Sequence, residues 1–196
     1  MILSDREIRL AIERGVIGLT SSPPPDSSRW SSTTVDLTLD NELRVWGPLL
    51  SPTGSDIVDP AGPGYNSSQL IAQYTTAVDC TGGFLLEPKA FVLGWTIERL
   101  RLPHESRIGA RVEGKSSHAR IGVGIHVTAP TIHPGFGSVS PGSPIRLEIW
   151  NAGSLRVRLT KGMPICQLIF EEVHGVPEAG YRGQFRTQGP PPSTST

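Results

Sequence analysis

The chain has 196 residues with 18 basic and 18 acidic side chains, so its formal net charge is zero. Because non-specific binding to nucleic acid depends on a surplus of Lys and Arg, we do not expect a nucleic-acid partner. No apolar run is long enough to cross a membrane and the first residues do not resemble a signal peptide, so no membrane partner is expected either.

The first expected element is a short helix. Ser4 and Glu7 have the spacing of a capping box, in which each side chain bonds to the backbone of the other residue. Apolar residues recur at helical spacing from Ile8, and Gly15 marks the end of the helix. The segment 21–32 is rich in Ser and Pro and is typical of a loop.

The segment 33–46 alternates between apolar and polar residues, with turn residues at Asp40 and Asn41. This pattern predicts two strands joined by a turn. Residues 47–80 contain several Gly, Pro and Ser and little periodicity, which predicts a long excursion with at most short strands.

From Gly83 onward, the pattern is typical of strands separated by turns. The expected strands are 84–86, 91–97, 107–112, 121–127, 145–150, 155–159 and 165–170. Short strands at this spacing predict an all-β barrel or jelly roll, in one domain over 1–185. Residues 186–196 end in a run of Pro, Ser and Thr and predict a mobile tail.

The two cysteines, Cys80 and Cys166, are too few for a disulfide framework. Their sequence neighbours are apolar, which favours buried free thiols. A cytoplasmic location is therefore the expectation.

The segment 114–120 is the first candidate for chemistry. It places Lys115, Ser116, Ser117 and Arg120 in one short loop, and these are the groups that bind phosphate in proteins. Its spacing is not that of a Walker motif, and taken alone the loop is more typical of a solvated turn.

Glu148 is the second candidate. Strand alternation over 145–150 places Arg146, Glu148 and Trp150 on one face. A carboxylate raised from a strand into a pocket can move protons, whereas on a solvent face it would form only a weak surface pair with Arg146.

A zinc-dependent deaminase needs His-x-Glu and Cys-x-x-Cys, and the chain has neither. His126 and His133 lie near the loop in sequence, but their spacing does not make a convincing metal site. A metal bound directly by the protein is therefore not expected.

Several segments together resemble the dCTP deaminase family of the dUTPase-like superfamily. They are MILSDREI at the start, TVDLTL at 34–39, GKSSHARIGV at 114–123, IHVTA at 125–129, LEIWN at 147–151, KGMPICQL at 161–168 and QFRTQG at 184–189. The segments occur in the family's order along nearly the whole chain. The resemblance implies a distorted jelly-roll barrel of the dUTPase-like type and homotrimers with active sites between subunits. It also implies conversion of dCTP to dUTP and ammonia without zinc, with Mg²⁺ bound through the triphosphate.

The resemblance also implies roles for individual residues. Glu148 would act as general base and acid, with Ser116 and Arg120 positioning water and stabilising charge. The residues implied to bind substrate are Lys115, Ser117, Thr128, Ala129, His133, Tyr181, Arg186 and Gln188.

The chain departs from the family pattern on the sugar and phosphate side. His133 stands where an aspartate usually holds the deoxyribose 3′-hydroxyl, and Gln184 stands where a lysine is usual. Roughly five extra residues follow Phe136. We expect deamination to be retained and sugar recognition to differ. Two alternatives are a dUTP diphosphatase or bifunctional deaminase–dUTPase, which His133 disfavours, and a catalytically weakened nucleotide-binding homologue.

Overall fold

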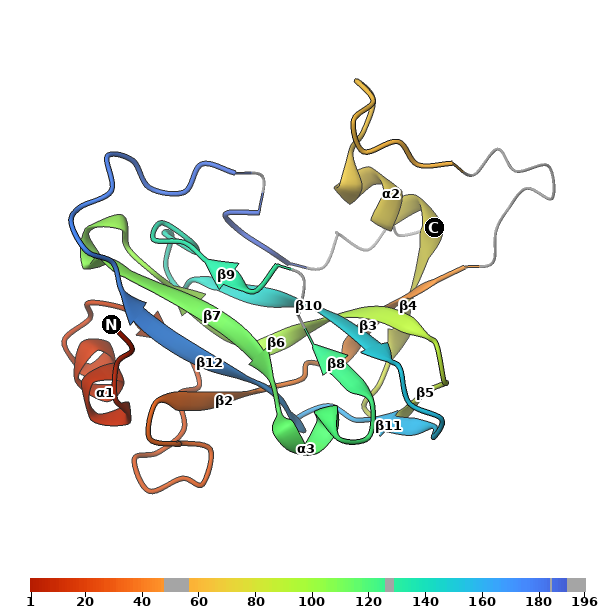
Figure 1. Ribbon diagram of the computed structural model, residues 1–196, viewed down its shortest axis with the longest axis horizontal. Coiled ribbons are helices and arrows are strands. Elements are labelled where there is room, and N and C mark those ends of the chain that lie inside the picture. The colour runs from red at the N-terminus through yellow and green to blue at the C-terminus, as the bar shows by residue number, and fades with distance from the viewer. Residues whose placement is uncertain (48–56, 126–128, 184, 190–196) are drawn as a thin grey trace.

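The computed structural model describes residues 1–47, 57–125, 129–183 and 185–189. Its larger sheet runs in the order β4 (Thr75–Asp79), β3 (Glu42–Trp46), β6 (Phe91–Arg101), β10 (Ser143–Asn151) and β8 (Val123–Ile125), with β1 (Gly18–Leu19) also paired to β6. The second sheet runs β2 (Thr34–Thr38), β12 (Pro164–Glu172), β7 (Ile108–Gly114) and β9 (Thr131–Ile132). A small third sheet pairs β11 (Val157–Leu159) with β5 (Phe84–Leu86) (Figure 1).

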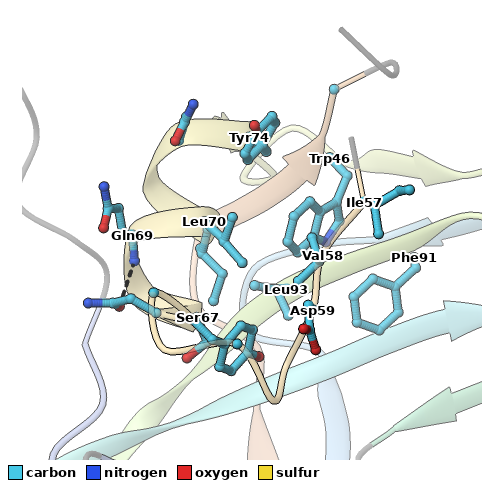
Figure 2. A pocket seen from close by; sticks show the side chains of 17 residues that line it. Trp46, Ile57, Val58, Asp59, Ser67, Gln69, Leu70, Tyr74, Phe91 and Leu93 are labelled. Carbon is cyan, nitrogen blue, oxygen red and sulfur yellow. Dashed lines mark hydrogen bonds between the residues drawn. The ribbon is translucent and has the colours of Figure 1, made fainter. Parts of the chain in front are cut away.

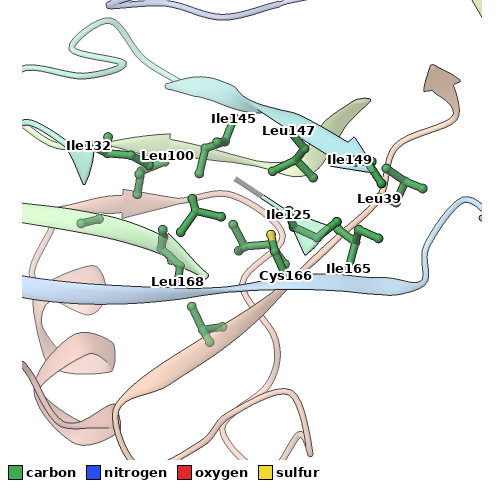
Figure 3. Close-up of a cluster of buried hydrophobic side chains, with 14 of the residues drawn as sticks. Leu39, Leu100, Ile125, Ile132, Ile145, Leu147, Ile149, Ile165, Cys166 and Leu168 are labelled. Atoms are coloured by element: carbon green, nitrogen blue, oxygen red, sulfur yellow. The ribbon is translucent and has the colours of Figure 1, made fainter. Parts of the chain in front are cut away.

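The hydrophobic core lies between the two larger sheets, as Figure 3 shows. From β10 it receives Leu147 and Ile149, and from β12 it receives Leu168; all three are fully buried. Strand alternation produces this arrangement, because every second residue of each strand points inward. The prediction of an all-β jelly-roll class with a short N-terminal helix is confirmed by these elements.

The N-terminal helix α1 (Asp5–Glu13) has the predicted capping box. The Ser4 side chain accepts from the Glu7 backbone N–H, and the Ser4 backbone N–H donates to the Glu7 carboxylate. Ile8 is buried against the core. Both cysteines are buried and free, as predicted.

The segment 47–80 differs most from its prediction, since its described part contains the helix α2 (Ser67–Tyr74) followed directly by β4. Asn66 caps this helix by accepting from the Gln69 backbone N–H. The helix has only two turns, too few for its periodicity to stand out among Gly, Ser and Pro residues. In Figure 1 it stands beside the end of the larger sheet, on the far side of the molecule from α1.

Most of the other strands differ from their predicted bounds by one or two residues, and two of the differences have a clear structural reason. Strand β6 continues to Arg101 because it pairs with β10 and β1 as well as β3. The strand expected over 121–127 begins only at Val123, because 116–119 form the helix α3 (Ser116–Ala119) and Gly122, at φ +87°, completes the turn after it. Residues 126–128 lie outside the described residues.

Candidate active site

A cavity of about 410 Å³ lies along the larger sheet, on the β10 face that carries Glu148. The burial of β10 alternates as its sequence predicts: Leu147 and Ile149 are in the core, while Arg146 and Glu148 line the cavity. Glu148 is the only carboxylate among the described lining residues. The predicted catalytic carboxylate therefore stands in a pocket and not on an open face.

Helix α2 forms one wall of this cavity through Ser67 and Ile71. Leu93 of β6 pairs in register with Glu148 and lines the same cavity. Sequence analysis missed this part of the cavity wall, because no helix was predicted over 67–74.

The opposite side of the cavity is built by the turn after β9. Its His133 ring packs against Tyr181, with ring centroids 5.5 Å apart. The Tyr181 backbone N–H donates to the carbonyl of Pro134 at 2.9 Å. Gly135 has φ +101°, and a Cβ there would lie 2.7 Å from the Tyr181 nitrogen, so only glycine permits this close approach. The turn and the C-terminal segment are thus held together at the cavity.

The C-terminal segment continues along the start of β10. Gln188 accepts from the Arg146 backbone N–H at 2.7 Å through its side-chain oxygen, and its own backbone N–H donates to the Ser143 hydroxyl. The Arg186 carbonyl accepts from the Gly137 N–H at 2.9 Å. Residues 185–189 therefore lie against the sheet, while Gln184 and 190–196 of the expected tail lie outside the described residues.

The loop expected to bind phosphate does not line this cavity. Ser116, Ser117 and Arg120 are exposed on and after α3, which lies at the β8 end of the molecule (Figure 1). The Lys115 ammonium forms a partly buried ion pair with the Asp36 carboxylate. Within a single chain, Ser116 and Arg120 therefore lie outside the cavity that contains Glu148.

Of the residues implied by the resemblance, the cavity brings together five: Ala129, His133, Glu148, Tyr181 and Gln188. Arg186 contributes a backbone contact next to it, and Thr128 lies outside the described residues. Arg146 is a lining residue for which no role was predicted, although its alternation with Glu148 indicated the shared face.

Arg146 modifies the electrostatics of the cavity. Burial lowers the pKa of its guanidinium, and the negative charge of Glu148 acts in the opposite direction. The guanidinium carbon lies 5.6 Å from the Trp95 ring centroid, in a cation–π arrangement.

A larger cavity of about 730 Å³ (Figure 2) shares the lining residues Ser67, Ile71 and Leu93 with the first. It lies between α2 and the sheet and is lined mainly by aromatic and aliphatic side chains, including Trp46, Tyr74 and Phe91. Asp59 is its only charged residue among those described. The larger cavity thus has one carboxylate in a mainly apolar lining, whereas the smaller cavity combines the carboxylate of Glu148 with Arg146 and His133.

Neither a metal centre nor a membrane helix is found in the described part of the chain. No group of three or more His, Cys, Asp or Glu side chains there is arranged to hold a metal ion. None of the helices described combines the length and apolar character that a membrane span requires.

The fold and the cavity define a jelly-roll protein with a carboxylate-bearing pocket on one face of its larger sheet. The model of the family described as dCTP deaminase-like matches residues 2–173. A relative from Sulfurihydrogenibium sp. (strain YO3AOP1), named "dCTP deaminase, dUMP-forming", is 36% identical over 96% of this chain and 93% of its own length. A relative of the same name from Mycolicibacterium gilvum (strain PYR-GCK) is 37% identical over 100% of this chain and 96% of its own.

The chain therefore belongs to the dCTP deaminase-like family. Among solved structures, the crystal structure of 2′-deoxycytidine 5′-triphosphate deaminase from Agrobacterium tumefaciens superposes with a TM-score of 0.63 at 22% identity. The match covers 88% of this chain and 48% of that one, so the chain spans about half the length of that protein. This likeness supports the fold assignment.

Proposed function

We propose that this protein hydrolyses the exocyclic amine of dCTP, giving dUTP and ammonia. The observation that carries the proposal is the position of Glu148 as the one carboxylate among the described residues lining a cavity of nucleoside size. The names of the relatives, which act on dCTP, support the substrate.

In the proposed mechanism, Glu148 accepts a proton from a water molecule while the water oxygen attacks C4 of cytosine. The carboxyl group delivers this proton to N3. It then takes the remaining proton from the new C4 hydroxyl and passes it to the amine, so that the bond from C4 to the amine breaks, ammonia departs and a C4 carbonyl is left. The Glu148 carboxyl group can act first as base and then as acid, because the two proton transfers follow each other at the same edge of the cytosine ring. A second polar set is needed to hold the water and stabilise charge at C4, and Ser116 and Arg120 have the required hydroxyl and guanidinium.

We infer that Ser116 and Arg120 reach the cavity from a second copy of the chain, in a homotrimer with active sites between subunits. Their exposure on α3, outside their own chain's cavity, supports this arrangement. Lys115 and Ser117 of the same loop would then face the triphosphate, with Tyr181, Arg186 and Gln188 closing from the tail.

We propose that Mg²⁺ arrives with the triphosphate as part of the substrate and that the reaction uses no zinc. Mg²⁺ in nucleotide sites is bound largely by phosphate oxygens and water, which needs no cage of protein side chains. The sequence, without His-x-Glu or Cys-x-x-Cys, supports a reaction in which the protein activates water through a carboxylate. The free thiols of Cys80 and Cys166 support a cytoplasmic location.

A second candidate function is deamination coupled to hydrolysis of the triphosphate, with dUMP as the final product. The names of the relatives favour it, since both are "dUMP-forming". His133 disfavours it, because dUTPase chemistry uses an aspartate in this region to activate water for attack on phosphate, and an imidazole lacks that carboxylate.

One assay separates these functions. Purified protein is incubated with dCTP and Mg²⁺, ammonia is measured, and nucleotides are resolved by chromatography. Equal amounts of ammonia and dUTP would support the first proposal, whereas dUMP and pyrophosphate would support the second. Tight dCTP binding without ammonia would contradict both and indicate a nucleotide-binding homologue without turnover.

A further inference from the structure

Arg146 stands beside Glu148 in the cavity, and the proposed reaction gives it no role. The two residues are neighbours on one face of β10, and two positions along a strand are roughly 6.6 Å apart. Among the described lining residues, Arg146 is the only arginine or lysine, just as Glu148 is the only carboxylate. The floor of the cavity therefore has an acceptor at one point and a cationic donor at the next.

The guanidinium is held in place by the sheet below it. Arg146 pairs in register with Trp95, and its guanidinium carbon lies 5.6 Å from the Trp95 ring centroid. Its Nε is buried and has no hydrogen-bond partner among the described residues. A buried donor without a partner is costly, and an incoming acceptor would remove that cost.

Gln188 adds a second donor at the same end of the cavity. Its side-chain oxygen is occupied by the Arg146 backbone N–H at 2.7 Å. Its backbone is also fixed, through two hydrogen bonds with the Ser143 hydroxyl. The side-chain amide NH2 is then the group that Gln188 has left to offer a ligand, and an amide NH2 only donates.

We propose that Arg146 is a specificity-determining residue that donates hydrogen bonds to an oxygen of the nucleotide's deoxyribose or α-phosphate. This inference rests on the proposed function, in which Glu148 faces the amino end of cytosine. The other end of the nucleotide carries sugar and phosphate oxygens, and it then lies toward Arg146 and the tail residue Gln188. A planar guanidinium is well suited to such oxygens because it donates from several N–H groups in a fixed geometry.

The test compares wild-type protein with Arg146→Met in calorimetric binding of three ligands: dCTP, 2′,3′-dideoxy-CTP and the α-thio analogue of dCTP. Methionine keeps an unbranched side chain over Trp95 while removing the charge and the donors. We expect Arg146→Met to bind dCTP about 10- to 100-fold more weakly, the range for a hydrogen bond to a charged group.

The analogues identify the oxygen. If Arg146 contacts the sugar, the difference between wild type and variant disappears with the dideoxy ligand; if it contacts the α-phosphate, the difference shrinks with the α-thio ligand. Either result supports the inference. Equal weakening for all three ligands, or unchanged dCTP binding, would overturn it, because a merely structural role does not depend on one ligand oxygen.

Arg101→Met is the control. Arg101 lies at the end of β6, donates to the Gly15 carbonyl and does not line the cavity. We expect it to bind all three ligands as wild type does. Arg146→Lys, which restores the charge without the planar fork, should recover part of the affinity for dCTP. Wild-type protein that binds dCTP but releases no ammonia would contradict the proposed reaction alone, because the Arg146 comparison measures binding.

Discussion

The cavity beside β10 and the loop around α3 differ in how completely one chain builds them. The cavity has a floor from two strands, a wall from α2 and a cover from Tyr181 and Gln188. On α3, Ser116 and Ser117 are exposed and their side chains make no described contact with the cavity. The carboxylate proposed to move protons therefore lies in a pocket, while the groups suited to phosphate lie on the surface.

The same difference appears in the charges of the two regions. In the cavity, Arg146 is partly desolvated and has no ion-pair partner among the described side chains at salt-bridge distance. In the loop, Lys115 is already paired with Asp36, whose backbone carbonyl also accepts from Arg29. The cavity therefore has a cation that is not engaged by a described carboxylate, whereas the loop is fixed to its own sheet through Lys115 and its two serines are exposed. Sequence motifs that occur in the family's order along a chain therefore need not form one site within that chain.

The largest expected effect comes from the cavity. Glu148→Gln removes the proton acceptor while keeping the shape of the side chain, and we expect kcat for ammonia release to fall by about 10²- to 10⁴-fold. Binding of dCTP should change little, because glutamine still fills the same volume. Ammonia assays and calorimetry on the same preparation provide both numbers.

Glu42→Gln is the control for this change, since Glu42 is a carboxylate of the same sheet that pairs with Arg44 outside the cavity. It should keep wild-type turnover. A Glu148→Gln variant that deaminates at the wild-type rate would remove the basis for assigning the chemistry to the cavity.

The next effect tests whether the two regions meet between subunits. Arg120→Met removes the cation expected to stabilise charge at C4, and we expect kcat to fall by about 10²- to 10³-fold. Co-expressed Arg120→Met and Glu148→Gln chains, purified as mixed assemblies, should then regain about a third of wild-type activity, because one of the three interfaces of every mixed trimer combines two intact contributions.

The mixed-chain experiment uses differently tagged subunits purified through both tags, with each single variant refolded alone as a control. Mixed assemblies as inactive as the single variants would show that Arg120 does not complete the Glu148 site of another chain. Size-exclusion chromatography with light scattering measures the assembly state of each sample.

The sequence predictions were correct where a few neighbouring residues determine the structure. The capping box of Ser4 and Glu7 and the alternation around Glu148 are encoded within a few residues, and both were confirmed. Helix α2 was missed because two turns flanked by Gly, Ser and Pro give no clear period. The contribution of α2 to the cavity wall could not be predicted, since it depends on how Ile71 comes to lie near Leu93 and Glu148, which are distant from it in the sequence.

A smaller effect is expected from the ion pair that fixes the loop. Asp36→Asn leaves the partly buried Lys115 ammonium without its carboxylate, and we expect a loss of roughly 1–2 kcal/mol in the free energy of unfolding. For a chain of this size that corresponds to a fall of roughly 2–8 °C in Tm. Urea denaturation followed by fluorescence provides the measurement.

Glu113→Gln is the comparison, because Glu113 and Arg111 form an exposed pair with side chains 45% and 36% accessible. Exposed pairs contribute little, so this variant should stay within about 0.5 kcal/mol of wild type. Equal losses for the two variants would mean that the Lys115–Asp36 pair does not anchor the loop.

The smallest expected effect is the pH dependence contributed by His118 of α3. Burial lowers the pKa of His118 from its ordinary value of 6.5. The Ile165 backbone and the Asp36 carboxylate raise this pKa, and the positive charge of Lys115 lowers it, so that the net shift is downward. As the pH falls below about 6.5, the His118 imidazole of the unfolded chain therefore binds a proton while that of the folded chain stays neutral. Stability from this group is therefore intact above that pH and is lost as the pH falls below it, until the folded-state pKa is reached. His118→Leu should flatten the decline of Tm between pH 7.5 and 5.5, and parallel declines for the two proteins would place the titrating group elsewhere.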